Sequence, residues 1–564
     1  MTVLVILPRT ALRHVIYDMT TMIRARITSA PVLVGLAVGV VSLALYLATV
    51  APTLTWGHNM TGVDGGELLA AADTFGVPHP PGYPTYTLLL KVFATVVPVG
   101  DFAFRGNVLS AVLASVSVVL LYLVILRFVR SLRPDSPTSI SVTSAALGAS
   151  VFSASPLFWS QATMTEVYTL NAAFAGGLAL LASRMALRLP GEDSGQAPDT
   201  TVHMALFGLL LGLGLGNHLT LLAVAVPLLA WLQLTVGWKK LASPWAVGAL
   251  ILGLGIYIYL PIRAASNPPI NWGDAGTPGG FAWMITGRAY QDYVFGVGVD
   301  SIPDKLLSWL ELVFAQLNPL GIFLGLVGGA MIRVEAPRFA LMSGLSMVAL
   351  SVYSITYNTV DSEVLTIPAF MVFTVWVGLG FSHIATGISA WAQRGLSGLK
   401  SGSARVVASY PLLVLGVVAF GALPLASVIL NYDEQNLRGE DQAYRYARVV
   451  IDSVPDGSLL LSSEENHAFS LWYMSYVEER ERDIVPLAVP LLQFDWYWED
   501  IQDRYPDRIP AEVNTDVNAA IQSVVEHNDG RSRIFFTFWD LSLDGQFDRE
   551  EAGNLFEARP KKDR

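Results

Sequence analysis

Long apolar stretches separated by shorter polar segments occupy most of the chain. A helix that crosses the hydrocarbon core of a bilayer needs about 20 mostly apolar residues. Eleven stretches fit this description: 32–51, 106–128, 139–157, 166–187, 203–218, 219–237, 244–262, 313–332, 339–356, 367–389 and 406–429. The division within 203–237 is the least defined, because this run can hold two crossings or a re-entrant element. The pattern predicts an α-helical polytopic membrane protein with about eleven transmembrane helices.

Basic residues gather at alternate ends of these stretches, and such clusters normally lie on the cytoplasmic side. The clusters are Arg24/Arg26, Arg127/Arg130/Arg133, Arg184/Arg188, Lys239/Lys240, Arg333/Arg338 and Arg394/Lys400/Arg405. Eleven crossings place all of them on one side. We therefore expect residues 1–30 to be a cytoplasmic leader, and loops 52–105 and 263–312 to lie on the opposite side.

From residue 431 onward the pattern changes to alternating helical and strand-like segments. "EDQAYRYARVVIDSV" has helical spacing, whereas "GSLLLSS", "DIVPLAVPLL" and "RIFFTFW" read as strands. This alternation is typical of a small parallel sheet. We expect a membrane domain over 31–430 and an extracytoplasmic α/β domain over 431–564.

Composition and charge support this division. The chain is 53% hydrophobic and 14% charged, whereas soluble proteins carry about 25% charged residues. Residues 431–564 contain 28 acidic and 14 basic residues, a net charge of −14, so a total of −11 leaves +3 for residues 1–430. An acidic domain argues against a nucleic-acid partner. The absence of cysteine excludes disulfides, thiolate nucleophiles and cysteine-ligated metals.

The segment "DGGELLAAADTFGVPHPPGYPTY", residues 64–86, carries the strongest candidate chemistry. Asp64 and Glu67 flank two glycines that allow a ligand to approach the backbone closely. His79 lies among prolines, which restrict φ and remove backbone donors. His79 and Tyr83 should therefore be held in a stiff turn close to the two carboxylates.

Further polar residues are expected on the same side of the membrane, where such residues tend to be functional. Each also has a structural explanation, such as a helix N-terminus for Glu166, packing for His218 or an interfacial anchor for Trp272. The candidate binding residues are Gln161, Glu166, Asn217, His218, Arg263, Trp272, Arg288 and Asp361.

These motifs resemble a family of polytopic membrane proteins, long of unknown function, whose animal members are protein O-mannosyltransferases acting on receptor immunoglobulin-like domains. The resemblance covers most of residues 56–500. It rests on the segment above and on "RGNVLSAVLASVSVVLLYLV", "WSQATMTEVYTLN", "GLGNHLT", "YLPIRAASNPPINWGD", "DSEVLTIPAF" and "LLLSSEENHAFSLWYMSYVEERERDIVPL". The family is related to the wider GT-C glycosyltransferases, which include the established protein O-mannosyltransferases.

The resemblance implies a GT-C-like fold and a catalytic acid at Asp64 or Glu67. His79-Pro80-Pro81 matches a His-Pro-Pro segment of those enzymes. Where relatives often have Gly-Asp-Asn after the C-terminal domain's strand, this chain has Ser463-Glu464-Glu465-Asn466.

The implied reaction moves a sugar, with mannose as the family's example, from a polyprenyl phosphate to a protein, glycan or lipid acceptor outside the cytoplasm. A first-loop carboxylate acts as general base, and a single displacement inverts the anomeric centre. Arg263 and Arg288 could neutralise the phosphate, so no metal is required, although a divalent cation is possible. We expect the enzyme in the cell membrane of a prokaryote. The alternatives are a transporter or flippase, and a non-enzymatic receptor.

One motif near the C-terminus is unrelated to this reaction. "DLSLDGQFDREE" places Asp540, Ser542, Asp544, Gln546, Asp548 and Glu551 at the ligand positions of a calcium loop. The strand-like segment before it favours the alternative, a solvated acidic turn.

Overall fold

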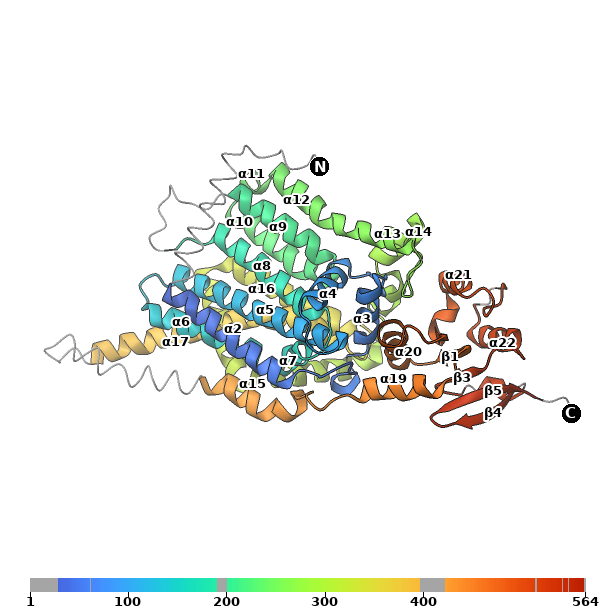
Figure 1. The fold of residues 1–564 in the computed structure, drawn as a ribbon. Helices are drawn as coiled ribbons and strands as arrows, with labels where there is room; N and C mark the ends of the chain where they lie inside the picture. The colour runs from blue at the N-terminus through green and yellow to red at the C-terminus, as the bar shows by residue number, and fades with distance from the viewer. Residues whose placement is uncertain are drawn as a thin grey trace.

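The structure is a computed structural model that describes residues 29–60, 62–189, 200–395, 421–512, 515–539, 541–545 and 547–561. A large helical domain carries a smaller C-terminal domain at one end (Figure 1). The helices of the larger domain are α2 (Ala30–Thr49), α3 (Gly65–Thr74), α4 (Pro84–Val96), α5 (Phe102–Leu132), α6 (Thr138–Ser153), α7 (Pro156–Ala162), α8 (Tyr168–Ala186), α9 (Thr200–Leu215), α10 (Leu222–Thr235), α11 (Trp238–Leu241), α12 (Pro244–Leu254), α13 (Tyr259–Ala264), α14 (Pro278–Ile285), α15 (Ile302–Glu335), α16 (Pro337–Thr356) and α17 (Ile367–Gly395). A further helix covers 421–435.

The predicted apolar stretches between residues 32 and 389 all coincide with helices. Prolines at the first or second position open α2, α4, α7, α12 and α16, where a missing backbone N–H costs nothing. In the described part of the chain six helices are long and apolar enough to cross a membrane, or seven if α6 and α7, bent by 69°, form one span. The protein is therefore an integral membrane protein, and the count of eleven crossings stays a prediction. The first 28 residues of the predicted leader lie outside the described residues.

The helices pack around α5, which contacts α2, α6 and α8. Small residues allow close approach where two helices cross. A Cβ placed on Gly212 of α9 would lie 2.5 Å from the Leu250 carbonyl oxygen of α12. Such small-residue contacts take the place of the hydrophobic effect when helices associate in lipid.

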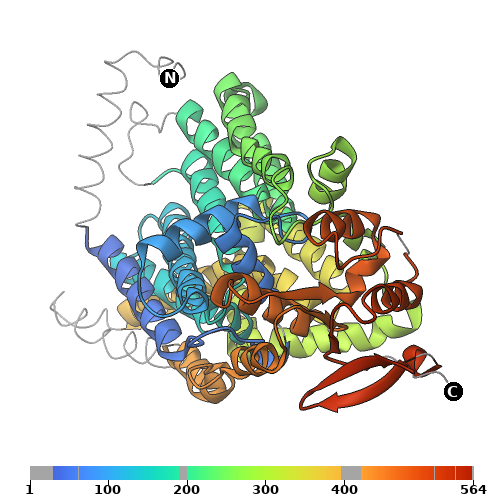
Figure 2. The same ribbon diagram turned by 45° about the vertical axis from the view of Figure 1, so that its right-hand side comes forward.

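The C-terminal domain is built on a five-stranded sheet with the order β2-β1-β3-β5-β4. The strands are β1 (Ser458–Ser462), β2 (Ile484–Ala488), β3 (Ile534–Phe536), β4 (Phe547–Ala552) and β5 (Leu555–Pro560), and the helices are α19 (Gln442–Ser453), α20 (Glu465–Tyr473), α21 (Asp495–Arg504) and α22 (Val517–His527). β1 pairs in parallel with β2 and β3, as the alternating pattern predicts. The antiparallel hairpin β4–β5 projects from the edge of the domain in both views (Figure 2).

This hairpin contains two of the six proposed calcium ligands. Asp548 and Glu551 lie on β4, and residues three apart on a strand face opposite sides. The Asp544 carboxylate accepts a hydrogen bond of 2.7 Å from the Trp539 indole. Asp540 and Gln546 lie outside the described residues, so the calcium loop stays a prediction, and the strand geometry favours the acidic turn.

The C-terminal domain docks on the helical domain through α20, which packs against α3. A Cβ on Gly66 would lie 2.5 Å from the Phe469 carbonyl oxygen, so only glycine permits this contact. The Trp56 indole donates hydrogen bonds of 3.1 Å to the Asn466 carbonyl and 2.8 Å to the Ser470 hydroxyl. These contacts hold α3 against the C-terminal domain.

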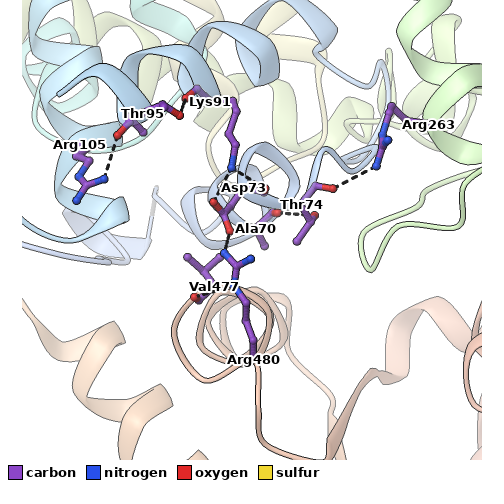
Figure 3. Close-up of polar contacts among 10 residues, drawn as sticks. Ala70, Asp73, Thr74, Lys91, Thr95, Arg105, Arg263, Val477 and Arg480 are labelled. Carbon is purple, nitrogen blue, oxygen red and sulfur yellow. Dashed lines mark hydrogen bonds and ion pairs between the residues drawn. The ribbon is translucent and has the colours of Figure 1, made fainter. Parts of the chain in front are cut away.

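A buried carboxylate at the end of α3 completes the junction. Asp73 accepts a 2.8 Å hydrogen bond from Lys91 of α4 and pairs with Arg480 of the C-terminal domain (Figure 3). One acid therefore joins three parts of the fold.

Candidate functional site

Asp64 and Glu67 lie at the start of α3, but they face different surroundings. Glu67 is fully buried, whereas 37% of the Asp64 side chain is exposed. The backbone turns into the helix directly after Asp64. Of the two predicted catalytic carboxylates, Asp64 is therefore the one that a substrate can touch.

His79 connects the two carboxylates. Its Nδ1 is hydrogen-bonded to Glu67 Oε2, and its backbone N–H donates to Glu67 Oε1 at 3.1 Å. Its Nε2 lies 3.0 Å from the Tyr83 hydroxyl and 3.7 Å from Asp64 Oδ2. Glu67 thus fixes the imidazole on one side, and Asp64 and Tyr83 lie on the other.

The proline-rich turn is held in place by a distant segment. Val77 forms a parallel bridge with Asn271. The Val77 N–H donates a 2.7 Å hydrogen bond to the Ile270 carbonyl, and the Val77 carbonyl accepts one of 3.0 Å from the Trp272 N–H. The Asn271 side-chain amide donates a hydrogen bond of 3.1 Å to the Asp500 carboxylate of α21. The C-terminal domain therefore supports the histidine turn through the 270–272 segment.

The charges of the two carboxylates control the protonation of His79. Burial opposes the imidazolium, but the negative charges of Glu67 and Asp64 outweigh it and raise the pKa of His79 to about 9. Burial also raises the pKa of Asp64 to about 6, against the lowering effect of His79 and with a further rise from Glu67 and Asp361. At neutral pH the site holds a carboxylate at Asp64 beside an imidazolium.

Aromatic rings surround this pair. Trp272 and Tyr290 lie edge-on to His79 with ring centroids 6.0 and 5.9 Å away. Tyr83 lies 6.2 Å from His218. The structure thus brings the predicted residues Trp272, Tyr83 and His218 close to His79 and Asp64, and adds Tyr290.

Three predicted residues lie deeper in the same region. Gln161, Glu166 and Asn217 are buried, and the Asn217 amide donates 3.2 Å to the Val167 carbonyl. Glu166 contributes to the electrostatic environment of Tyr83. Of the three, Glu166 is close enough to Asp64 for their charges to interact.

Glu465 at the first turn of α20 also belongs to this region, although the sequence motifs did not assign it a role. Burial, and next the charge of Asp64, raise the pKa of Glu465, while His79 opposes the rise. The signal in the sequence was the replacement of the relatives' Gly-Asp-Asn by Ser463-Glu464-Glu465-Asn466. An acid from the C-terminal domain therefore faces the first-loop site.

The two predicted phosphate-binding arginines already have protein partners. Arg263 donates hydrogen bonds of 2.7 Å to the Phe75 carbonyl and 3.4 Å to the Thr74 carbonyl at the end of α3 (Figure 3). Arg288 donates a hydrogen bond of 2.8 Å to the side-chain oxygen of Gln291. His79 is the cation in contact with Asp64, and phosphate binding by the arginines stays a prediction.

Within the described residues no group of three or more His, Asp or Glu could hold a metal ion. The described residues therefore offer no candidate ligands for a divalent cation. That the reaction needs no metal stays a prediction.

Known proteins similar to this chain share both of its domains. The model "Protein O-mannosyl-transferase TMEM260 N-terminal domain" matches residues 64–242, and "TMEM260-associated domain 2" matches 443–528. The mouse protein O-mannosyl-transferase TMEM260 is 27% identical over 470 residues, which cover 81% of this chain and 63% of the mouse protein. The Dictyostelium discoideum protein of the same name is 25% identical over 481 residues, covering 80% and 57%. These matches confirm the resemblance that the motifs indicate, although the chain spans less than two thirds of these relatives' length.

Solved structures confirm the GT-C-like fold. ArnT from Cupriavidus metallidurans bound to undecaprenyl phosphate has a TM-score of 0.54 at 13% identity, covering 94% of this chain and 98% of ArnT. The apo oligosaccharyltransferase from Archaeoglobus fulgidus has a TM-score of 0.51 at 14% identity, covering 92% of this chain and 70% of that chain. At such identities the likeness concerns the fold alone.

Proposed function

We propose that this protein is a GT-C-type glycosyltransferase that moves a sugar from a polyprenyl-phosphate donor to a hydroxyl group of an acceptor outside the cytoplasm. The observation that carries the proposal is the partly exposed Asp64 carboxylate beside the buried Glu67–His79 pair. The part of this chain that matches the N-terminal family model also begins at Asp64.

The names of the relatives support mannose as the sugar and a protein as the acceptor. The undecaprenyl phosphate bound to ArnT supports a polyprenyl-phosphate donor. Glycan and lipid acceptors remain alternatives to test. Because the named relatives come from mouse and Dictyostelium, the proposal concerns the non-cytoplasmic side of a membrane rather than a prokaryotic cell envelope.

Asp64 acts as the general base. It takes the proton of the acceptor hydroxyl as that oxygen attacks the anomeric carbon. The new glycosidic bond forms while the bond from the anomeric carbon to the phosphate oxygen breaks, and its electron pair leaves with the polyprenyl phosphate. Because there is one displacement, the anomeric configuration inverts.

Glu67 and His79 act differently from Asp64. Glu67 has no exposed surface, so it is a positioning residue that keeps His79 protonated. The imidazolium keeps the pKa of Asp64 from rising further and offsets negative charge as the phosphate departs. Trp272 and Tyr290 form aromatic walls against which a sugar ring can pack.

The test is a transfer assay in liposomes. The wild-type protein receives labelled polyprenyl-phosphate mannose and acceptor membrane proteins, and release of polyprenyl phosphate is measured. Asp64→Asn should lower the rate by about 10²–10⁴-fold. Asp529→Asn, a matched change at an exposed position of the C-terminal domain, should leave it unchanged.

Two results would contradict the proposal. One is a wild-type rate in Asp64→Asn. The other is the absence of release by the wild-type protein with polyprenyl-phosphate mannose and with other polyprenyl-phosphate hexoses.

A further inference from the structure

Helix α15 is too long for a single crossing. Its 34 residues would measure about 51 Å at 1.5 Å per residue, whereas the hydrocarbon core of a bilayer is about 30 Å thick. The helix is broken at Asn318, which has φ 49° and ψ 168°. The Asn318 side-chain oxygen accepts hydrogen bonds of 3.2 Å from the backbone N–H groups of Leu320 and Gly321. A second helix therefore starts after Asn318, with its own N-terminal cap.

The first half, residues 302–317, is fastened to the protein along one face. The Gln316 side-chain oxygen accepts a 2.8 Å hydrogen bond from the Leu157 N–H at the bend between α6 and α7. The Lys305 ammonium lies 3.5 Å from the Thr359 carbonyl, in the loop before α17. These two contacts fix the rotation of the helix about its axis.

The remaining surface divides into an apolar and a polar stripe. Leu306, Leu307, Leu310 and Phe314 are 46%, 57%, 42% and 55% exposed, and their spacing of three and four residues puts them on one face. The residues Asp304, Ser308, Glu311 and Ala315 are also exposed and form the neighbouring stripe. A helix with one protein-facing, one apolar and one polar stripe fits a membrane–water interface.

We propose that residues 302–317 form an interfacial helix, whose apolar stripe lies in the lipid leaflet on the side of the C-terminal domain. Only the second half then crosses the membrane. The occupant is lipid because the second half, which begins directly after the break, also exposes apolar side chains, those of Phe323, Leu326 and Val334. The exposed acids Asp304 and Glu311 keep the first half out of the hydrocarbon core.

The interfacial helix also relates the site to the membrane surface. Rings of Tyr290, Tyr293 and Tyr357 follow one another with centroids 6.3 and 6.1 Å apart, leading from His79 to the loop that Lys305 contacts. Because the helix lies at the membrane surface and is linked to His79 through these rings, the proposed active site lies close to the lipid headgroups. This consequence rests on the proposed function, whereas the position of the helix does not.

The absence of cysteine makes the inference directly testable. Leu307→Cys and Phe314→Cys sample the apolar stripe, and Ser308→Cys and Glu311→Cys are matched controls on the polar stripe. Each full-length variant carries a nitroxide label in phosphatidylcholine–phosphatidylglycerol nanodiscs. Collision with oxygen, which concentrates in lipid, is compared with collision with a water-soluble nickel chelate. Retained thermal melting establishes that each variant folds, and Leu310→Cys replaces an apolar-stripe variant that does not.

The oxygen-to-nickel ratio should be severalfold higher at the apolar-stripe positions than at Ser308→Cys and Glu311→Cys. Equal nickel access on both stripes would mean a water-exposed helix and would overturn the inference. Low access of both reagents to the apolar stripe would mean that a protein partner covers it, which also overturns it. High oxygen and low nickel access at all positions would mean that the helix spans the membrane. None of these outcomes depends on transferase activity, so the inference can fail separately from the proposed function.

Discussion

Replacing Glu67 by Gln should separate its role from that of Asp64. The charge of Glu67 is the largest electrostatic contribution to the high pKa of His79. That pKa, about 9, lies well above the ordinary histidine pKa of 6.5, and the difference corresponds to roughly 3 kcal/mol in favour of the imidazolium. Glutamine keeps the size of the side chain but removes the charge. Burial then opposes the imidazolium while only Asp64 and Glu465 still favour it, so the pKa of His79 should fall.

The sign of the effect on activity follows from the proposed roles. In the wild-type protein, transfer should increase with pH through about 6 as Asp64 loses its proton, and decrease above about 9 as His79 loses its proton. In Glu67→Gln the upper limit should move to lower pH. Each unit by which the pKa of His79 falls below the assay pH lowers the imidazolium fraction, and with it the rate, about tenfold. The increase in rate at low pH, which follows the ionisation of Asp64, should move little. Removing the Glu67 charge lowers the pKa of Asp64, whereas loss of the His79 charge raises it.

The assay is the pH profile of polyprenyl-phosphate release in liposomes. Glu512→Gln is the matched control because Glu512 is exposed in the C-terminal domain, and its profile should equal that of the wild type. Glu67→Asp keeps the charge and should retain part of the activity at high pH. A Glu67→Gln protein that folds and keeps the wild-type upper limit would refute this role for Glu67. Equal loss at every pH would indicate a purely structural role.

Further predictions concern the domain junction, the orientation and the C-terminal loop. Gly66→Ala should destabilise the protein by about 1–3 kcal/mol because its Cβ would clash with the Phe469 carbonyl; thermal melting should show this, with Gly248→Ala, where there is open space, as the control. Trp56→Phe removes both indole hydrogen bonds to α20 and should cost about 1–3 kcal/mol; an unchanged melting temperature would show that these bonds do not stabilise the junction. Protease added to the non-cytoplasmic side of sealed membranes should remove a C-terminal tag and spare an N-terminal one, and the reverse result would invert the proposed orientation. Millimolar Ca²⁺ should leave the melting temperature of the full chain unchanged if 540–551 is an acidic turn, whereas a rise with Ca²⁺ and not with Mg²⁺ would support the calcium loop.

Much of the helical architecture could be predicted from the sequence, because apolar length determines which segments can cross a membrane. The stiff turn around His79 was also predictable, since proline restricts the backbone locally. The parallel β1–β2 pairing of the C-terminal domain followed from its alternating pattern. The break in α15 was harder to predict, because it depends on the side chain of Asn318 capping the helix that follows.

The assignment of roles within the site needed the tertiary structure. Asp64 and Glu67 are three residues apart and have similar chemistry, so sequence alone left the general base undecided. Their difference arises because α20, some 400 residues later in the chain, packs on α3 while Asp64 stays partly exposed. Arg263 is a second example. Its charge suggested that it binds phosphate, but in the structure its guanidinium donates hydrogen bonds to the carbonyls at the end of α3. Local sequence determined which groups could do chemistry, and long-range packing decided their exposure, partners and charge, because burial and neighbouring charges set the pKa values of titratable groups.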